Sequence, residues 1–321
     1  MTAPQAPIHL TTAVTQANYD EERYLAANPD VARAVQSGSM RSGRAHFEAF
    51  GAREGRSFRS ALPPAAKRAK LEAMFPLLRS DLTMRSLPEY YDFLTDALRG
   101  QFNIIDTDQV SANEYDPNVL ALIERHRNGW VLDCGAGLRS TYYPNVINFE
   151  IAPYDTTDVR GVAECLPFID AAFDAVISIA VLEHVKDPWA AAREIARVLK
   201  PGGDIYCCVP FLQPLHGYPH HYYNMTHQGL ANLFVDDIDI DVVDVLPSTL
   251  PIWALTWIVR SWADGLQGDA RREFLNLKLR DLTGNVADHL GRAFVQELSH
   301  QKNLELACAT VLSGRRKRKL A

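Results

Sequence analysis

The segment WVLDCGAGLRS (residues 130–140) decides the fold of this chain of 321 residues. It predicts an apolar strand that ends at Asp133, followed by a loop in which Gly135 and Gly137 let the backbone approach a ligand closely. The next apolar run, VINFE, ends at Glu150, 17 positions after Asp133. Nucleotide-binding sheets place a carboxylate at about this spacing to bind ribose hydroxyls. The segment therefore predicts a nucleoside site at the ends of parallel strands.

An ordered series of further motifs follows. Residues 163–203 read AECLPFIDAAFDAVISIAVLEHVKDPWAAAREIARVLKPGG. The LPF, FD and LKPGG elements resemble those of class I S-adenosylmethionine-dependent methyltransferases with a type 11 domain. The resemblance implies an α/β fold with a doubly wound, Rossmann-like, seven-stranded methyltransferase sheet, and S-adenosylmethionine as the cofactor.

The resemblance also assigns cofactor contacts. Asp133 would hold the glycine loop or the ammonium of the cofactor through water, and Glu150 would accept both ribose hydroxyls. Relatives usually have an aspartate before the AExLPF motif, where this chain has Val162, so the adenine contact falls either to Glu164 or to the backbone of Ala163. The expected cofactor-binding residues are Asp133, Gly135, Gly137, Glu150, Ala163, Glu164 and Ile179.

Two other classes of protein stay open at this point. Leu138 and Arg139 stand where the family has a third glycine, which disfavours a dinucleotide-dependent oxidoreductase because such an enzyme must cradle a pyrophosphate. A non-catalytic binding or scaffold protein built on a methyltransferase-like core is the alternative. In that case Asp133 and Glu150 would be ordinary carboxylates at strand ends.

The acceptor side is predicted from the segment VPFLQPLHGYPHHYYNMTHQGL (residues 209–230), which follows the fifth expected strand. Methyl transfer to a hydroxyl needs a base, and a histidine with a near-neutral pKa suits that task. The candidate catalytic residues are His184, His220 and His221, although each could simply line the pocket. We expect no metal, because no cysteine or carboxylate lies at ligand spacing within this segment.

Composition narrows the partners. The formal net charge of −6 argues against broad binding to nucleic acid. The methyltransferase resemblance leads us to expect a small-molecule or glycan-like acceptor and O-methylation, while methylation of N or C stays open. The run LPIWALTWIV (residues 250–259) is too short to span a bilayer, so it predicts a buried or interfacial helix and no stable membrane insertion. Five cysteines without C-x-x-C spacing, and no visible signal peptide, favour the cytoplasm. The oligomeric state stays open.

The organisation along the chain is predicted from changes in pattern. The motifs YLAANPDV and HFEAFGAREGR resemble a helical module of bacterial multidomain proteins, for which tethering and simple packing are equally open roles. Lys67, Arg68 and Lys70 are expected on a solvated helix face.

Further strands are expected near residues 174–179, 204–209, 238–246 and 304–312. The expected parts are a disordered N-terminus (1–17), a small helical module (18–60), a helical linker or cap (61–115), a methyltransferase domain (116–313) with a helical insertion before the last strand (about 251–302) that covers the active-site side, and a basic tail (314–321).

Overall fold

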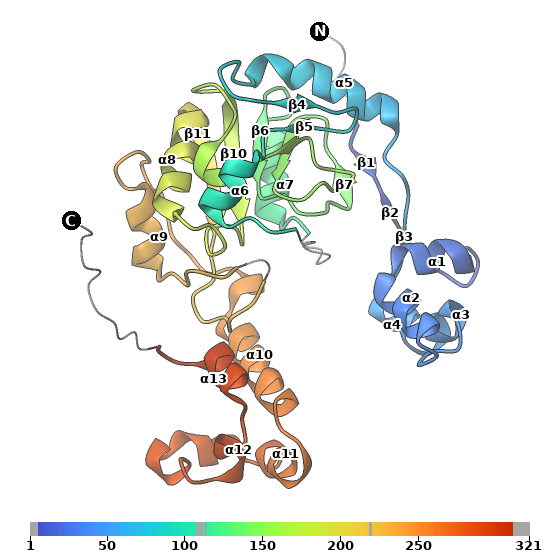
Figure 1. Ribbon diagram of the computed structural model, residues 1–321, viewed down its shortest axis with the longest axis vertical. Helices are drawn as coiled ribbons and strands as arrows, with labels where there is room; N and C mark the ends of the chain where they lie inside the picture. Colours follow the sequence, from blue (N-terminus) through green and yellow to red (C-terminus); the bar gives the residue numbers. More distant parts are fainter. Residues whose placement is uncertain (1–5, 107–111, 113, 218–219, 311–321) are drawn as a thin grey trace, which may run out of the picture.

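A seven-stranded sheet forms the centre of the protein (Figure 1). The computed structural model describes residues 6–106, 112, 114–217 and 220–310. The strand order is β11-β10-β6-β8-β9-β5-β4, and every neighbouring pair is parallel except β4 with β5. The strands are β4 (Arg85–Ser86), β5 (Tyr91–Asp92), β6 (Val131–Cys134), β8 (Val146–Glu150), β9 (Val159–Arg160), β10 (Phe173–Ile179) and β11 (Leu199–Cys208). The predicted fold class is confirmed.

Alternation along the central strands builds two apolar layers. On one face, Val131, Val146 and Ala175 pack against α7 (Pro117–Arg125). On the other face, Leu132, Ile147 and Val176 share a core with α5 (Pro64–Met74), α8 (Pro188–Val198) and α9 (His227–Phe234). Helices on both faces leave the carboxyl ends of the strands as the place for a site.

Side-chain caps start the helices that flank the sheet. Asp116 accepts hydrogen bonds from backbone amides at the start of α7, and Asp187 and Thr226 do the same for α8 and α9. Each cap satisfies donors that have no partner inside the helix. These caps set where α7, α8 and α9 begin.

The N-terminal segment is not disordered where the structure describes it. Strand β1 (Ile8–His9) pairs with β7 (Thr141–Tyr142), and β2 (Thr11–Ala13) pairs with β3 (Ser57–Arg59). Leu10 and Val14 are buried. The prediction of disorder over residues 1–17 is therefore wrong for residues 6–17, because their pairing partners lie far away in sequence. Residues 1–5 lie outside the described part.

A small helical unit follows and lies to one side of the sheet, reached through β1, β2 and β3 (Figure 1). Its core contains Tyr24, Val31, Phe47 and Phe58. Its elements are α1 (Glu21–Ala27), α2 (Pro29–Gln36), α3 (Gly43–His46), the π-helical turn η1 (Phe47–Gly51) and α4 (Ala52–Glu54). The separate core supports the proposal that residues 18–60 form a module.

The segment 61–115 is more than a helical linker. Besides α5, η2 (Phe75–Leu77) and α6 (Asp96–Phe102), it contributes β4 and β5 to the central sheet. The expected solvated stripe is also wrong for Lys67 and Lys70, which are each 5% exposed. Both ammonium groups are drawn inward by the buried carboxylate of Asp158.

The C-terminal part differs most from the expectation. Residues 238–246 form no strand, and 239–245 are exposed; the described part of 304–312 begins within the helix α13. The Asp-Ile alternation around residues 236–241 has the period of a strand, yet no sheet edge receives it. The helical segment 251–302 therefore follows the last strand instead of interrupting the sheet. The expected basic tail (314–321) lies outside the described residues.

The C-terminal helices enclose a small core of their own. Ala263, Leu266, Phe274 and Phe294 pack together there. The elements are η4 (Pro247–Thr249), α10 (Pro251–Asp264), α11 (Gly268–Leu275), η5 (Leu279–Thr283), η6 (Val286–Asp288), α12 (Ala293–Gln296) and α13 (His300–Leu306). The helix predicted at residues 250–259 exists. Trp253 on it is 62% exposed, so the expectation that this helix is buried in a core is wrong. Within the described ranges, no helix has the length and apolar character needed to cross a bilayer.

Asp158 joins several elements of this architecture through one buried carboxylate. Its oxygens lie 3.0 Å from Lys67 Nζ and 2.6 Å from Lys70 Nζ, and they accept hydrogen bonds from the Tyr142 hydroxyl and the Asn148 amide. Burial alone would raise the pKa of Asp158, but the two lysines and these donors hold it below the usual value. The cluster connects α5 and β7 to the sheet.

We predict that Asp158→Asn lowers the free energy of unfolding by about 3–5 kcal/mol, because two buried ammonium groups lose their counterion. Urea unfolding of both proteins measures the difference. The matched control is Asp170→Asn, since Asp170 is exposed and its pair with Arg197 contributes little. The folded-state pKa of Asp158 is lowered, so its contribution is present above the unfolded pKa of about 3.9 and declines as the pH falls below it. Equal midpoints for wild type and Asp158→Asn at neutral pH would contradict this assignment.

Candidate functional site

The loop after β6 requires its two glycines. Gly135 and Gly137 have φ angles of +85° and +63°, which favour glycine. A Cβ atom on Gly135 would lie 2.3 Å from a methyl group of Val181. The amides of Gly135 and Ala136 both donate to Phe149 O, at 2.9 and 3.0 Å. The loop is therefore held tightly between the end of β8 and the turn after β10.

Glu150 closes this loop from the next strand. Its Oε2 accepts from the Gly137 amide at 2.7 Å, and its Oε1 accepts from the amides of Ile151 at 2.7 Å and Ala152 at 3.4 Å. Burial raises the pKa of Glu150, and the three amide hydrogen bonds oppose that rise. Because each carboxylate oxygen has two lone pairs, Oε2 can still accept a hydroxyl of a ligand.

Asp133 lies under the loop with a partner that the sequence analysis did not assign. Its Oδ2 lies 2.8 Å from Arg139 Nε and 2.6 Å from Arg139 Nη2, and it also accepts from the Tyr115 hydroxyl. The guanidinium lies 4.0 Å from the centre of the Tyr115 ring. Asp133 Oδ1 is buried without a hydrogen-bond partner among the described residues. Arg139, one of the two residues that stand where the family has a third glycine, thus balances the charge of Asp133.

The remaining cofactor candidates have different surroundings. Ala163 is buried in the turn η3 (Ala163–Cys165), and Ile179 packs with the core on the α7 face. Glu164 Oε1 accepts from the amides of Lys186 and Asp187, at 3.0 and 3.3 Å. Glu164 therefore supports the segment before α8. A contact between any of these three and a cofactor stays a prediction.

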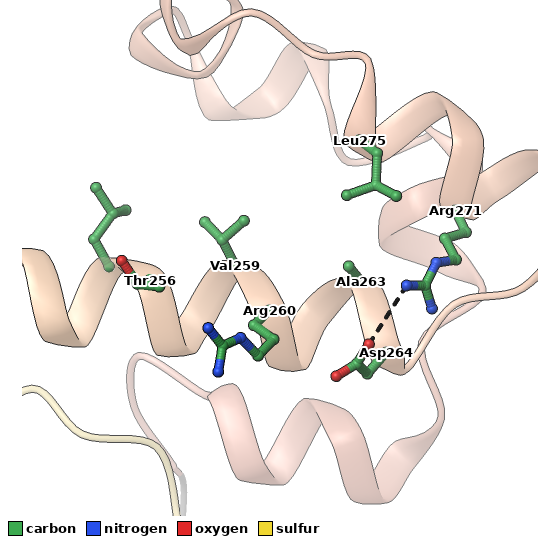
Figure 2. A pocket seen from close by; sticks show the side chains of 8 residues that line it. Thr256, Val259, Arg260, Ala263, Asp264, Arg271 and Leu275 are labelled. Carbon is green, nitrogen blue, oxygen red and sulfur yellow. Dashed lines mark ion pairs between the residues drawn. The ribbon is translucent and has the colours of Figure 1, made fainter. Parts of the chain in front are cut away.

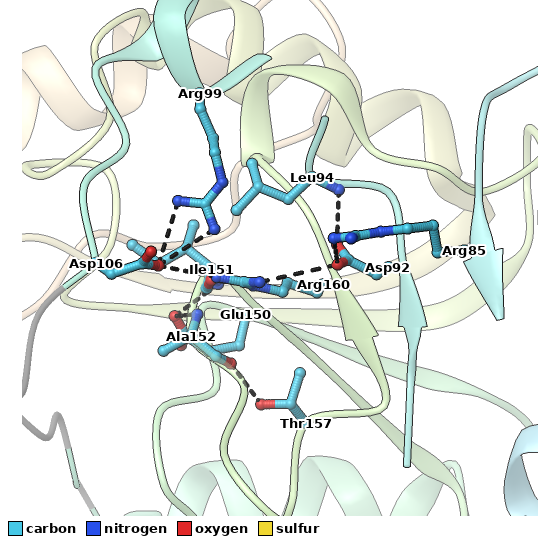
Figure 3. A network of polar contacts seen from close by, with 10 residues as sticks. All are labelled: Arg85, Asp92, Leu94, Arg99, Asp106, Glu150, Ile151, Ala152, Thr157 and Arg160. Atoms are coloured by element: carbon cyan, nitrogen blue, oxygen red, sulfur yellow. Dashed lines mark hydrogen bonds and ion pairs between the residues drawn. The ribbon is translucent and has the colours of Figure 1, made fainter. Parts of the chain in front are cut away.

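Arg160 fixes the backbone just after Glu150 (Figure 3). Its Nε donates to Ile151 O at 2.8 Å, and its other nitrogens lie 3.1 Å from Asp106 and 3.8 Å from Asp92. Asp106 also pairs with Arg99 at 3.2 Å. One guanidinium therefore ties β9, β5 and the loop after β8 together. The sequence analysis did not identify this network, since no motif spacing links its members.

His184 lies just beyond β10 with one ring nitrogen in use. Its Nδ1 is 2.7 Å from His220 O, and a carbonyl only accepts, so Nδ1 carries the proton and Nε2 has the lone pair. Burial lowers the pKa of His184, and the neighbouring rings of His216 and His221 lower it further. Both effects favour the neutral form of the ring. Its Nε2 is 3.7 Å from Glu183 Oε1.

The other two candidate histidines make different contacts. His221 Nδ1 accepts from the His216 amide at 3.1 Å, and its Nε2 donates to Asn224 Oδ1 at 2.9 Å. His220 Nε2 donates to Asn103 O at 3.0 Å. The ring of His221 is thus committed at both nitrogens, and that of His220 at one.

The histidine-rich loop rests directly on the turn that carries His184. The amides of Tyr222 and Tyr223 both donate to Glu183 O, at 2.7 and 3.2 Å. A Cβ atom on Gly217 would lie 2.4 Å from the His184 ring, so this position requires glycine. The C-terminal helices border the same loop, because Trp257 lies 5.1 Å from the His216 ring. The residues Tyr218 and Pro219 lie outside the described part.

Glu183 is the acidic residue that the sequence analysis missed. Its side chain is fully buried, and neither carboxylate oxygen has a hydrogen-bond partner among the described residues. Burial raises its pKa to about 8. A buried polar group without a partner costs free energy, so this carboxyl group needs a proton or a cation. Its position beside His184 in the LEHV motif is the sequence signal that could have identified it.

A pocket of about 360 Å³ lies elsewhere, between α10 and α11 (Figure 2). Its lining is mostly apolar, with one ion pair of 3.5 Å between Arg271 and Asp264. None of the site residues predicted from sequence lines this pocket. The candidate site is therefore the edge of the sheet, where the glycine loop and the histidines lie.

Comparison with known proteins relates this part of the chain to a family of enzymes. A family described as a methyltransferase domain matches residues 131–207. The protein YafE of Escherichia coli is 55% identical over 47 residues, which cover 15% of this chain and 23% of YafE. A methyltransferase of Mycobacterium sp. (strain JLS) is 47% identical over 45 residues, 14% of this chain and 18% of that protein. A demethylmenaquinone methyltransferase of Mycolicibacterium vanbaalenii is 46% identical over 57 residues, 18% of this chain and 25% of that enzyme. The matched segments thus span a quarter or less of these three relatives.

Solved structures give weaker matches. The [4+2]-cyclase SpnF has a TM-score of 0.32 and 19% identity, covering 56% of this chain and 71% of that protein. A methyltransferase-like structure from Bacillus halodurans has a TM-score of 0.32 and 16% identity, covering 52% of this chain and 87% of that protein. The family match, and not these scores, identifies residues 131–207 as a methyltransferase domain of the class I S-adenosylmethionine-dependent type.

Proposed function

We propose that this chain transfers a methyl group from S-adenosylmethionine to a hydroxyl group of a small-molecule or glycan-like acceptor. One observation carries the proposal. The turn after β10 contacts the glycine loop through Val181 and supports the histidine-rich loop through Glu183. A cofactor site and an acceptor site at these two places would therefore be neighbours, as direct transfer requires.

The residues on the cofactor side fit S-adenosylmethionine. The two glycines leave the loop without side chains that would block a ligand, and Glu150 Oε2 keeps a lone pair for a ribose hydroxyl. Asp133 Oδ1 is a buried acceptor without a partner among the described residues, which suits an ammonium group. When bound, the cofactor supplies an electrophilic methyl group on a sulfonium.

The residues on the acceptor side act by positioning and by accepting a proton. Among the three candidate catalytic residues, His184 is the one held through Nδ1 with its Nε2 lone pair directed away from that anchor. A hydroxyl that donates to Nε2 would lose its proton there as the oxygen attacks the methyl group. His220 and His221 hold the loop, through Asn103 and Asn224.

The direct test of the proposal is transfer itself. The full chain is incubated with isotopically labelled S-adenosylmethionine and fractionated cell extract, and mass spectrometry identifies molecules that gain a methyl group. Label on a hydroxyl of a small molecule or glycan is the expected result. Tight cofactor binding without transfer in any fraction would instead favour the non-catalytic alternative.

We predict that Glu150→Ala weakens binding of S-adenosylmethionine by about 1.5–3 kcal/mol, or about 10- to 150-fold, because a charged acceptor of hydrogen bonds is lost. Isothermal titration calorimetry with the cofactor and with S-adenosylhomocysteine measures this change. Glu124→Ala is the matched control, since Glu124 is exposed on α7. Superimposable titration curves for wild type and Glu150→Ala would remove Glu150 from the site.

We predict that His184→Ala lowers turnover by about 100- to 10,000-fold and leaves cofactor affinity unchanged, because His184 lies on the acceptor side. Steady-state kinetics with the identified acceptor, together with calorimetry, separates the two effects. His227→Ala is the control, because His227 is an exposed residue at the start of α9. A variant of His184 with wild-type turnover would assign the chemistry to other residues.

A further inference from the structure

Three potential metal ligands meet at the acceptor edge. The carboxylate of Glu183 and one ring nitrogen each of His184 and His216 lie within 4.8 Å of one another. Glu183 and His184 come from the turn after β10, and His216 comes from the loop after β11. Two separate segments of the chain therefore direct ligand atoms toward one point.

Both histidines are oriented as metal ligands usually are. His184 Nδ1 lies 2.7 Å from His220 O, and His216 Nδ1 lies 2.8 Å from Pro214 O. A carbonyl oxygen only accepts hydrogen bonds, so both rings carry their proton on Nδ1 and their lone pair on Nε2. Metal-binding histidines characteristically donate a hydrogen bond from the N–H of their second ring nitrogen to such a carbonyl.

The third group, Glu183, is a buried acid with no local compensation. Neither of its oxygens has a hydrogen-bond partner among the described residues, and His184 Nε2 lies 3.7 Å from its Oε1. A cation bound between these groups would supply the counter-charge that the buried carboxylate lacks.

We propose that Glu183, His184 and His216 bind a divalent transition-metal ion, for which Zn²⁺ is the best match. Two imidazoles and one carboxylate are a ligand set of zinc sites that keep a fourth position open. Zinc binds nitrogen and oxygen at about 2.0–2.2 Å, and in a tetrahedral site bonds of about 2.1 Å place neighbouring ligand atoms about 3.4 Å apart. The 3.7 Å between Glu183 Oε1 and His184 Nε2 is close to this value, so small side-chain rotations complete the site.

This site differs from the expectation drawn from the sequence. No carboxylate lies within the histidine-rich segment, but the fold brings Glu183 to it from 33 residues before His216. The inference goes beyond the proposed function and does not depend on it. An ion on His184 Nε2 would occupy the lone pair that the proposed mechanism gives to the acceptor, so the metal-bound form should transfer methyl groups more slowly.

The test is metal binding by the full chain, prepared without a histidine tag and stripped with a chelator. Zn²⁺ is titrated in competition with a chromophoric chelator, without cofactor or acceptor. We expect one equivalent of Zn²⁺ per chain, and a tetrahedral visible spectrum when Co²⁺ is used instead. Glu183→Gln and His216→Gln should each weaken Zn²⁺ binding by at least about 100-fold, since changes outside the ligand set already cost 10- to 100-fold. His227→Ala should bind as wild type does.

Two further measurements make the result decisive. Circular dichroism checks that both variants are folded, and calorimetry checks that they still bind S-adenosylmethionine, whose site is built around Gly135 and Glu150. Loss of Zn²⁺ with the cofactor retained supports the metal site alone. If wild type binds no Zn²⁺, or if Glu183→Gln and His216→Gln bind it as tightly as wild type, the proposal is overturned while the proposed methyl transfer is untouched.

Discussion

The contact between the glycine loop and the turn after β10 is the constraint on which both halves of the site depend. Gly135 has no side chain, and a methyl group of Val181 fills the space where its Cβ would be. The same loop is fastened to β8 through the Gly137 amide and Glu150. Because Glu183 and His184 follow Val181 directly, the packing that shapes the cofactor loop also sets the position of the acceptor-side residues. A larger residue at position 135 would therefore disturb both sides together.

Three carboxylates lie at this edge of the sheet, and the structure stabilises them in different ways. Asp133 is paired with the guanidinium of Arg139, and Glu150 accepts three backbone amides. Glu183 has neither kind of partner. Since an unpaired buried charge is costly, Glu183 is the carboxylate of the three whose negative charge the fold leaves without compensation among the described residues. Asp133 and Glu150 therefore suit a structural or cofactor-binding role, whereas Glu183 suits the binding of a positive charge.

Local sequence patterns predicted the part of the fold in which neighbouring segments pair. The strand predicted to end at Asp133, which continues to Cys134, and the strand ending at Glu150 follow from apolar runs. Features that depend on distant partners could not be predicted in this way. Lys67 read as a surface residue because its counterion, Asp158, lies 91 positions away, and β4 and β5 are too short to carry a period. Within the site, the glycine loop was predictable from its spacing. The ion pair between Arg139 and Asp133 was not, because Arg139 departs from the family pattern and no known motif links the two residues.

The acceptor side also shows how the C-terminal helices come to bear on the site. The expected insertion into the sheet is absent, yet the Leu215 amide donates to Glu305 O at 2.9 Å, and Trp257 contacts the His216 ring. The histidine-rich loop is therefore held between the turn after β10 on one side and α10 and α13 on the other. A molecule or ion bound at His216 would lie close to both the turn after β10 and α10. The position of this loop, and with it that of His216, therefore depends on the C-terminal helices as well as on the sheet.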